Sequence, residues 1–271
     1  MDLINKKILQ LKLNDNSTQL VTNRIKKSEV ISRNENGINE VIVYWGLEEM
    51  TELNQLVTFN QNLPSPITRD YEWSGLYEPF DHQRVTSEFL SVNKRAFCFN
   101  EAGTGKTSSA LWAADYLMNE DKVKRVLIIC PLSIMYSAWQ ADIFNTCMHR
   151  TSQVCHGTAE KRRLIINSEY EFVIINYDGV AIVKEDIKNA DFDLIIIDEA
   201  NAYKSTTTSR WKTISKIVKP HTRIWMMTGT PASQSPEDAF GLARLVCPER
   251  VPKFKTAWRD RVMYQVSRFR W

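Results

Sequence analysis

Short apolar runs recur through the middle of the chain, at residues 96–99, 126–130, 172–175, 194–197 and 224–227. Stretches with the composition of helices separate these runs. Each run is predicted to be a strand, and the run that ends at residue 197, which shows no polar alternation, is predicted to be a buried parallel strand. Strands that alternate with helices at this spacing predict an α/β fold, in which helices cover both faces of a parallel sheet.

Residues that follow the ends of these predicted strands are candidates for a binding site. Lys106, Pro131, Tyr177, Asp198 and Thr228 each come shortly after one of the runs. The carboxyl ends of parallel strands meet at one edge of the sheet, and ligands collect there. We therefore expect these five residues to share one edge.

A glycine-containing loop at residues 101–107 lies between the apolar run 95–99 and the helix-like stretch 108–114. This is the strand, loop and helix order of a phosphate-binding loop, in which glycines let backbone N–H groups turn towards phosphate oxygens at a helix start. Lys106 is expected to reach the outer phosphates of a nucleotide, and the hydroxyl of Thr107 to bind Mg²⁺. The predicted binding residues are Gly103, Thr104, Gly105, Lys106 and Thr107, and Asn100 stands where the strict pattern has its first glycine.

Two adjacent carboxylates, Asp198 and Glu199, directly follow the run 194–197. Asp198 is expected to bind the Mg²⁺ shell, and Glu199 to orient or deprotonate an attacking water. Alternatively, both residues only begin the next helix, where acidic side chains are favoured. The phosphate-binding loop upstream favours the catalytic interpretation.

The composition is that of an ordinary globular protein. The chain has 271 residues, of which 43% are hydrophobic and 25% charged, so it can bury a large α/β core. No apolar stretch approaches the length that spans a membrane, and residues 1–7 lack the apolar core of a signal peptide. The five cysteines are odd in number, which favours reduced thiols. We therefore expect a protein that works inside a cell.

Soft metal ligands gather at Cys147, His149, Cys155 and His156. Their Cys-x-His and Cys-His spacings differ from the Cys-x-x-Cys spacing of structural zinc sites. We interpret these four as ordinary loop residues rather than as a metal site.

The two ends of the chain differ from its middle. Residues 1–70 combine alternating stretches at 8–13 and 41–45 with polar turns at 14–17 and 34–37, and with a helix at 47–60. This pattern predicts a small α+β accessory domain, followed by a nucleotide-binding domain at 71–271. Residues 250–271 form a basic tail with seven Lys or Arg against one acid, interleaved with aromatic side chains. Such a tail suits contact with nucleic acid, and an amphipathic helix packed on the domain explains it equally well.

Further motifs occur in a fixed order around the loop and the carboxylate pair. They are Phe80-Asp81-His82-Gln83, the segment 126–133 followed by Trp139, the segment 174–178, the segment 201–204 followed by Ser209-Arg210, and the segment 227–231. In this order the motifs resemble the first RecA-like lobe of superfamily 2 helicases, and most closely the Snf2-like branch of DNA translocases. The resemblance covers residues 76–248.

The resemblance implies a role for each motif. Gln83 would hydrogen-bond the adenine of ATP, and Phe80 would stack beside it. The residues implied to contact a nucleic-acid backbone are Ser133, Tyr177, Lys204 and Arg210, although Lys204 and Arg210 could also be ordinary surface charges. Thr228, Gly229 and Thr230 would couple the nucleotide state to nucleic-acid binding. ATP and Mg²⁺ are the implied cofactors, and DNA, bound with little sequence specificity, is the implied partner.

Two departures from the family pattern affect these expectations. Asn201 stands where the family usually has histidine, so a hydrogen-bonding group remains but a titratable ring is lost. A second RecA-like lobe, with the arginine that stabilises charge in phosphoryl transfer, is absent. We therefore expect the chain to bind Mg-ATP but to hydrolyse it slowly, as a fragment of a longer motor or as half of a site that a partner completes. An RNA-dependent ATPase and a nucleotide-dependent regulatory module without motor activity are the alternatives.

Overall fold

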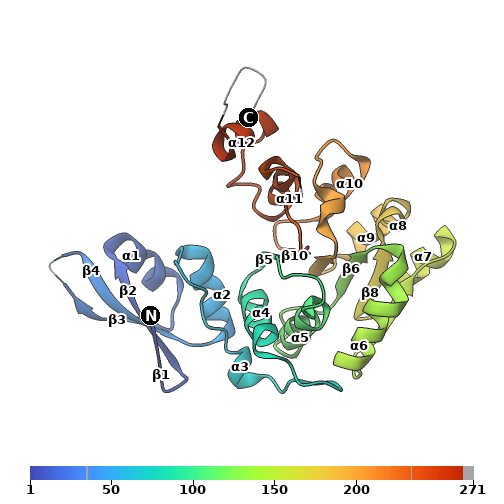
Figure 1. Cartoon of the computed structure of the whole chain (residues 1–271). Coiled ribbons are helices and arrows are strands. Elements are labelled where there is room, and N and C mark those ends of the chain that lie inside the picture. Colours follow the sequence, from blue (N-terminus) through green and yellow to red (C-terminus); the bar gives the residue numbers. More distant parts are fainter. Residues whose placement is uncertain (35, 233, 265–271) are drawn as a thin grey trace. The chain divides into compact units, whose positions relative to one another are not determined.

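Two sheets of different kinds organise the chain (Figure 1). The computed structural model describes residues 1–34, 36–232 and 234–264. They divide into two compact units: the first contains Met1–Trp73 and Pro79–Asn93, and the second contains Ser74–Glu78 and the residues from Lys94 onward. Each unit has a sheet of its own, and the expected domain boundary near residue 70 stays a prediction.

The first unit is built on a four-stranded antiparallel sheet with the order β1-β2-β4-β3. Leu9 and Leu11 of β2 and Val41 of β4 are buried, as the period-two pattern of these stretches predicts. Val21 and Met50, on the helices, are also fully buried and close this core. The elements are β1 (Asp2–Ile4), β2 (Ile8–Asn14), α1 (Asp15–Arg24), β3 (Ser28–Arg33), β4 (Ile38–Tyr44), α2 (Leu47–Leu56), α3 (Ile67–Asp70) and α4 (Asp81–Val92).

The polar residues 14–17, predicted to form a turn, instead begin helix α1, so that prediction was wrong. The side-chain oxygen of Asn14 accepts a hydrogen bond from the backbone N–H of Ser17 at 2.8 Å, which satisfies one of the free donors at the helix start. Asn, Asp and Ser favour turns and helix starts for the same reason, because their short side chains bond nearby backbone groups. The helix expected at 47–60 also ends earlier, at Leu56.

The second unit contains a six-stranded sheet with the order β5-β10-β9-β6-β8-β7, and all its strand pairs are parallel. All five predicted apolar runs are strands of this sheet, which confirms the α/β fold class. The edge strand β7 was not predicted. The strands are β5 (Arg95–Cys98), β6 (Val126–Cys130), β7 (Ser152–Cys155), β8 (Phe172–Asn176), β9 (Leu194–Ile197) and β10 (Arg223–Met227). The helices are α5 (Lys106–Asn119), α6 (Ala141–Thr146), α7 (Ala159–Ile166), α8 (Tyr177–Ile182), α9 (Lys184–Ala190), α10 (Ser209–Ile217), α11 (Ala239–Val246) and α12 (Lys255–Val262).

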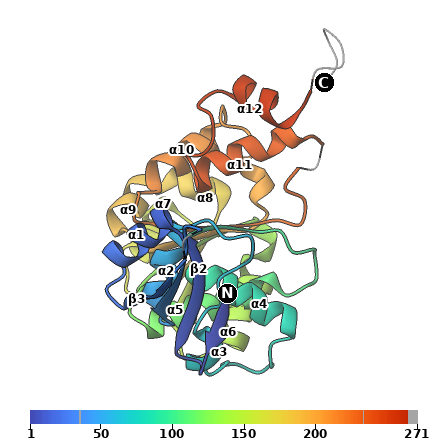
Figure 2. The ribbon, with the colours of Figure 1, turned by 90° about the vertical axis from the view of Figure 1, so that its left-hand side faces the viewer.

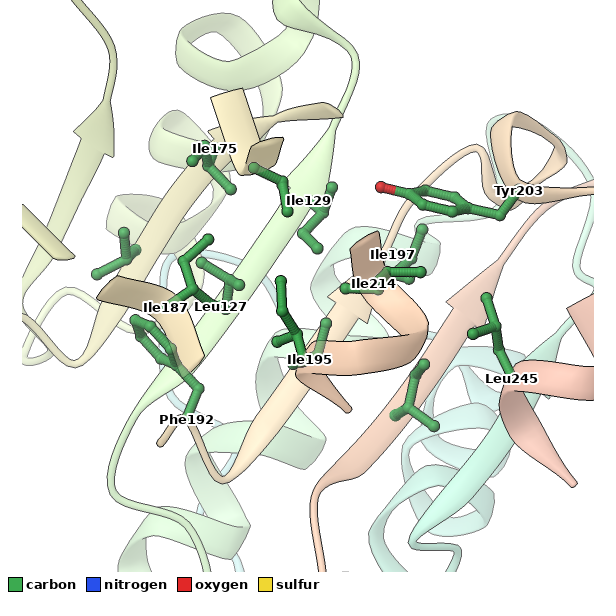
Figure 3. Packing of buried hydrophobic residues seen from close by; sticks show 14 of the residues in the cluster. Leu127, Ile129, Ile175, Ile187, Phe192, Ile195, Ile197, Tyr203, Ile214 and Leu245 are labelled. Carbon is green, nitrogen blue, oxygen red and sulfur yellow. The ribbon is translucent and has the colours of Figure 1, made fainter. Parts of the chain in front are cut away.

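The core of the second unit lies on both faces of this sheet. On one face, side chains such as Leu127, Ile195 and Ile197 pack against Ile214 of α10 and Leu245 of α11 (Figure 3). The alternate residues of the same strands, Ile128, Ile174 and Ile196, are completely buried as well. Helices therefore cover both faces, as the unbroken apolar runs predict. Among the described residues, no helix has the length and apolarity needed to cross a membrane.

Helix α12 lies against α11 near the end of the described chain (Figure 2). The ring centroid of Trp258 is 6.2 Å from that of Phe240, and Lys255 and Arg259 both form ion pairs with Glu237. Residues 255–262 of the basic tail thus form a helix that contacts the domain through Trp258, and two of its cations are paired. Residues 265–271 of the tail, which include Arg268, Phe269, Arg270 and Trp271, lie outside the described residues.

Candidate functional site

The loop between β5 and α5 has the backbone shape of a phosphate-binding loop. Gly103 and Gly105 have φ angles of +77° and +72°, a region that L side chains rarely adopt. A Cβ atom placed on Gly103 would meet no atom within 4 Å, so space is open above the loop. The left-handed turn at Gly105 begins α5, a helix of 14 residues whose first N–H groups face the loop.

Two polar side chains of the loop point inward to the same backbone oxygen. The Lys106 ammonium donates a hydrogen bond to the carbonyl of Glu101 at 2.7 Å, and the Thr104 hydroxyl donates to it at 2.8 Å. Thr107 lies half-buried in the first turn of α5. The lysine, the threonine hydroxyl and the helix start therefore lie around one turn of backbone.

Asp198 follows β9 and is bonded on several sides. Its backbone N–H donates to Ile129 of β6 at 2.9 Å. One carboxylate oxygen, Oδ1, accepts from the N–H of Glu199 at 2.9 Å, and the other, Oδ2, accepts from the indole N–H of Trp139 at 3.0 Å. Burial raises the pKa of Asp198 above its ordinary value, while these two hydrogen bonds and the charge of Lys106 oppose that rise. A buried carboxylate with fixed orientation is thus placed within the electrostatic reach of Lys106.

Glu199 has an unusual backbone conformation. Its φ angle is +46° and its ψ angle is +53°, a left-handed geometry that costs energy for a residue with a side chain. Its side chain is exposed at the edge of the sheet, while its carbonyl accepts a hydrogen bond from the Tyr177 hydroxyl at 3.2 Å. Strain of this kind gathers at functional sites, which agrees with a role for Glu199 beyond starting a helix.

The segment Thr228–Thr230 joins the loop after β9 to the phosphate-binding loop. Thr228 is fully buried and its N–H donates to Cys98 at 3.1 Å. The side-chain amide of Asn201 donates to the hydroxyl of Thr230 at 2.8 Å. A Cβ on Gly229 would lie 3.6 Å from backbone atoms of the phosphate-binding loop. The predicted coupling segment therefore contacts both parts of the site, and Asn201 keeps a direct bond to it despite replacing a histidine.

The four predicted nucleic-acid contacts lie in different environments. Ser133 is exposed in the short 3-10 helix Leu132–Ile134. Lys204 lies 3.6 Å from a carboxylate oxygen of Asp238, and Arg210 lies 2.8 Å from one of Asp178. Arg210 also lies over the ring of Tyr177, whose hydroxyl points inward and donates to the carbonyl of Asp198 at 2.7 Å. These roles stay predictions; the structure adds that Tyr177 also fixes the backbone next to the carboxylate pair.

Phe80 and Gln83 belong to the first unit. The side-chain oxygen of Gln83 accepts a hydrogen bond from the N–H of Phe80 at 2.9 Å, the bond that a glutamine in the first turn of a helix makes to the residue preceding it. Phe80 is 70% exposed and stacks against His82. The adenine contacts implied for both residues stay predictions. The hydrogen bond to Phe80 also stabilises the start of α4, which is a structural role for Gln83 that needs no adenine.

The residues around the loop fit a Mg²⁺–nucleotide. Mg²⁺ prefers oxygen ligands and usually binds to one or two protein groups together with phosphates and water. The Thr107 hydroxyl and the Asp198 carboxylate are ligands of this kind, and the open space at Gly103 leaves room for phosphates. Within the described ranges, no group of three or more His, Cys, Asp or Glu could hold a metal by itself. A site of two protein oxygens is the kind that depends on the nucleotide for its remaining ligands.

The cysteine–histidine cluster has other partners in the structure. Cys147 and Cys155 are buried and free, and burial raises the pKa of both thiols, that of Cys155 to about 11. The imidazole Nε2 of His149 lies 3.0 Å from a carboxylate oxygen of Asp115. Cys155 ends strand β7, so the interpretation of this cysteine as a loop residue was wrong, whereas Cys147 directly follows the end of α6.

Trp139 is the site residue whose position the sequence did not reveal. It belongs to a segment expected to touch nucleic acid, yet its ring is fully buried and bonded to Asp198. The segment Met135–Gln140 is a π-helix, which shifts side-chain directions relative to an α-helix. The spacing of apolar residues does not reveal a π-helix. The sequence therefore did not indicate that the Trp139 side chain points into the domain.

Comparisons with known proteins agree with this geometry. The family model of the SNF2-related domain matches residues 82–267. An uncharacterized ATP-dependent helicase of Bacillus subtilis is 24% identical over 64% of this chain and 30% of its own length. The SWI/SNF-related matrix-associated actin-dependent regulator of chromatin subfamily A-like protein 1 of Xenopus laevis is 26% identical over 68% of this chain and 18% of its own. The chain therefore spans less than a third of the length of these relatives.

Solved structures share the fold. The SWI2/SNF2 ATPase core of Sulfolobus solfataricus in complex with dsDNA superposes with a TM-score of 0.61 at 21% identity, over 69% of this chain and 39% of that one. The same core domain, solved separately, superposes with a TM-score of 0.55 at 20% identity, over 73% of this chain and 42% of that one. At this identity the likeness shows the RecA-like fold of the second unit.

Proposed function

The chain belongs to the SNF2-related domain family. From this premise we propose that it is the ATP-binding lobe of a DNA-dependent ATPase. The complete enzyme would couple Mg-ATP hydrolysis to movement along DNA or to remodelling of DNA. One observation is the main support. The phosphate-binding loop, the Asp198–Glu199 pair and the segment Thr228–Thr230 follow the adjacent parallel strands β5, β9 and β10, so they lie at one edge of the sheet. A hydrogen bond from Asn201 to Thr230 links the loop after β9 to this segment. A loop for phosphates, a metal-binding carboxylate and a water-activating carboxylate are the parts that phosphoryl transfer needs.

The residues of the chain divide the chemistry between them. The N–H groups at the start of α5 and the Lys106 ammonium bind the phosphate oxygens and neutralise their charge. Thr107 and Asp198 hold Mg²⁺, which, when bound, stabilises negative charge on the outer phosphates. Glu199 orients a water molecule for attack on the terminal phosphorus and accepts its proton, while the bond to the leaving ADP breaks. The phosphate product then leaves the loop beside Gly229 of the coupling segment.

DNA is the proposed nucleic acid. Membership of the family supports this choice, and one relative by fold was solved in complex with dsDNA. Ser133 is exposed, and a groove of about 580 Å³ between α9 and α10 is lined by Lys184, Lys188, Lys212 and Lys216. Lysines on the surface favour the phosphate backbone over base edges, so binding should show little sequence preference. A motor of this kind works inside the cell, where its DNA is.

The catalytic site needs a further component. The matched relatives are more than three times as long as the stretch aligned here, and phosphoryl transfer in such motors uses an arginine from outside the first lobe. We therefore propose that a second RecA-like lobe, in a longer chain or in a partner, completes the site. Without it, the chain binds Mg-ATP and turns it over slowly.

The test compares nucleotide binding and hydrolysis in the same protein. A fluorescent ATP analogue should bind the chain in the presence of Mg²⁺, and Lys106→Ala should weaken this binding at least tenfold because it removes a charge-assisted contact to phosphate. ATP turnover should be slow and should rise when duplex DNA and the second lobe are both present. Glu199→Gln should abolish that turnover but keep binding, since the amide cannot accept the proton.

Three outcomes would count against the proposal. If the chain binds no Mg-nucleotide, the site is not a nucleotide site. If RNA rather than duplex DNA stimulates turnover, the chain belongs to an RNA-dependent ATPase. If nucleotide binding persists but no nucleic acid changes turnover in the presence of the second lobe, the chain is a regulatory module without motor activity.

A further inference from the structure

The segment that follows β6 has two faces with different surroundings. Ser133 and Tyr136 are exposed, and the side chain of Tyr136 is 55% accessible. Met135 and Trp139, four residues apart in the π-helix Met135–Gln140, are completely buried. The outer face is the one expected to contact a nucleic-acid backbone, and the inner face is directed into the domain. One short segment therefore extends from the surface to the interior of the site.

The indole of Trp139 ends at the proposed Mg²⁺ ligand. Its Nε1–H donates to Oδ2 of Asp198 at 3.0 Å, and the only other hydrogen bond to this carboxylate within the described residues comes from the N–H of Glu199 to Oδ1. Each carboxylate oxygen keeps a lone pair for a metal or a metal-bound water. Removal of the indole N–H would leave the carboxylate held at one oxygen only, free to turn about its side-chain bonds.

The surroundings make this bond sensitive to small movements. Asp198 is only 8% exposed and Trp139 is fully buried, so the indole donates to Oδ2 from the interior side. Its loss would leave that side of the carboxylate without a protein donor among the described residues. The backbone of Asp198 is fixed by its bond to Ile129 of β6. By contrast, the π-helix is a turn type of low intrinsic stability that occurs often at functional sites. A shift of this segment would change the orientation of the carboxylate while the strand stays in place.

This inference rests on the proposed function. We propose that Trp139 is a positioning residue that couples two binding events. One is the binding of duplex DNA to the outer face of residues 132–137, and the other is the binding of Mg²⁺–nucleotide at Asp198. The indole orients the metal-binding carboxylate, and DNA contacts at the outer face shift or fix the segment from which the indole projects. This path runs through one hydrogen bond and is separate from the bond between Asn201 and Thr230. Because coupling is reciprocal, Mg²⁺–nucleotide must change DNA affinity by the same factor.

The first test removes the indole N–H and keeps an aromatic ring, with Trp139→Phe. The matched control is Trp112→Phe, because Trp112 is also a buried tryptophan of the second unit, and its indole donates to the carbonyl of Ser74 at 2.8 Å, not to the site. Binding of a fluorescent ADP analogue is titrated with Mg²⁺, and urea unfolding of each variant is recorded. Groups that orient a metal ligand typically change metal affinity by about 10-fold to 100-fold.

The expected result is specific to Mg²⁺. In Trp139→Phe the half-saturating Mg²⁺ concentration should rise about tenfold or more, while analogue binding in EDTA and DNA binding without nucleotide stay unchanged. The factor by which duplex DNA alters Mg²⁺–nucleotide affinity should fall towards one. Trp112→Phe should leave the Mg²⁺ titration and this factor as in the wild type. Equal shifts in both variants, or an unchanged factor in Trp139→Phe, would overturn the proposal.

A second measurement uses the unaltered protein and does not depend on the stability of Trp139→Phe. The indole N–H resonance of Trp139 is identified as the one that Asp198→Asn displaces in the NMR spectrum. It should move on addition of Mg²⁺–ADP and again on addition of duplex DNA, whereas the Trp112 resonance should not. If DNA leaves it in place while Mg²⁺–ADP moves it, only the coupling is refuted. If the wild type binds no Mg²⁺–nucleotide at all, the proposed function and this inference both fail.

Discussion

The side chain of Asn201 bonds directly to the coupling segment, through the 2.8 Å hydrogen bond from its amide to the hydroxyl of Thr230. We expect Asn201→Ala to leave Mg-nucleotide binding intact but to reduce the effect of nucleotide on DNA affinity by about fivefold or more, the lower end of typical coupling between sites. Thr230→Val removes the other partner. If the bond is responsible, the double variant should be no worse than either single variant.

That double-mutant cycle is read from DNA affinities with and without Mg²⁺–nucleotide. Independent, additive effects of the two substitutions would show that the hydrogen bond is not the coupling element. An amide does not titrate, so we also expect the coupling to be constant across the pH range in which a histidine would change its charge.

Asp198 leads to a prediction on pH. Burial raises its pKa, so the native protein binds this proton more tightly than the unfolded chain does. At a pH above the raised pKa, Asp198 is ionised in the native protein and lowers the free energy of unfolding. As the pH falls through this raised pKa, Asp198 takes up its proton and the destabilisation disappears. The free energy of unfolding of Asp198→Asn minus that of the wild type should thus increase from about pH 4 towards neutral pH. Urea unfolding over this range measures the difference, and a difference independent of pH would contradict the assigned pKa shift.

The sequence predicted where some candidate site residues lie but not where other side chains point. The structure places Lys106 at the start of α5 and Asp198 directly after β9, as the loop and strand-end motifs predict. Their roles stay predictions. Trp139 and Tyr177 were assigned to the nucleic-acid side, but the indole of one and the hydroxyl of the other bond to the loop at Asp198. Only the π-helix and the packing of the sheet determine where those groups point.

Helix α11 contacts the loop after β9 without any intervening side chain. A Cβ atom on Gly241 would lie 2.2 Å from the carbonyl oxygen of Lys204, and this oxygen belongs to backbone that cannot move aside easily. We expect Gly241→Ala to lower the free energy of unfolding by about 1–3 kcal/mol, the usual cost of forcing extra volume into a packed region.

Gly241→Ala should also displace the backbone of Lys204, a predicted nucleic-acid contact, so any weakening of DNA binding would show that Lys204 contributes despite its ion pair with Asp238. The control is Ala239→Ser, a substitution of similar size on a half-buried position of the same helix. Urea unfolding and DNA binding of both variants give the comparison. A Gly241→Ala protein as stable as the wild type would mean that α11 can shift away from the loop at little cost.

The strands of the parallel sheet were easier to predict than the elements around them. Buried strands are unbroken apolar runs, and all five such runs are strands. The two edge strands, β5 and β7, are both only partly buried. Strand β5 still contains an apolar run, whereas β7 begins with Ser152 and Gln153 and gave no such signal. Helix α1 begins with Asn14 and Asp15, residue types that favour turns just as strongly. Prediction was therefore accurate where burial determines the sequence and wrong where local polar groups determine the structure.

The described chain contains one lobe of the proposed motor, and we expect DNA to bind it at a lysine-lined groove. Lys184, Lys188, Lys212 and Lys216 line the groove between α9 and α10. Within the described residues Lys188, Lys212 and Lys216 form no ion pair, while Lys184 lies 3.9 Å from Glu185. Three unpaired ammonium groups on one groove are therefore available to phosphates, in contrast to Lys204 and Arg210, which already pair with carboxylates.

This arrangement predicts the salt dependence of DNA binding. Each phosphate contact that is lost should reduce the slope of log affinity against log salt concentration by about 0.9. The double variant Lys212→Gln, Lys216→Gln should therefore reduce the slope by about 1 to 2 and weaken binding equally for unrelated duplex sequences. Lys161→Gln removes one positive charge from α7, which does not line the groove, and should change the slope less than the single groove variant Lys212→Gln does. If the groove variant and the control change the slope equally, the effect is due to net charge alone, and DNA must cross the domain elsewhere.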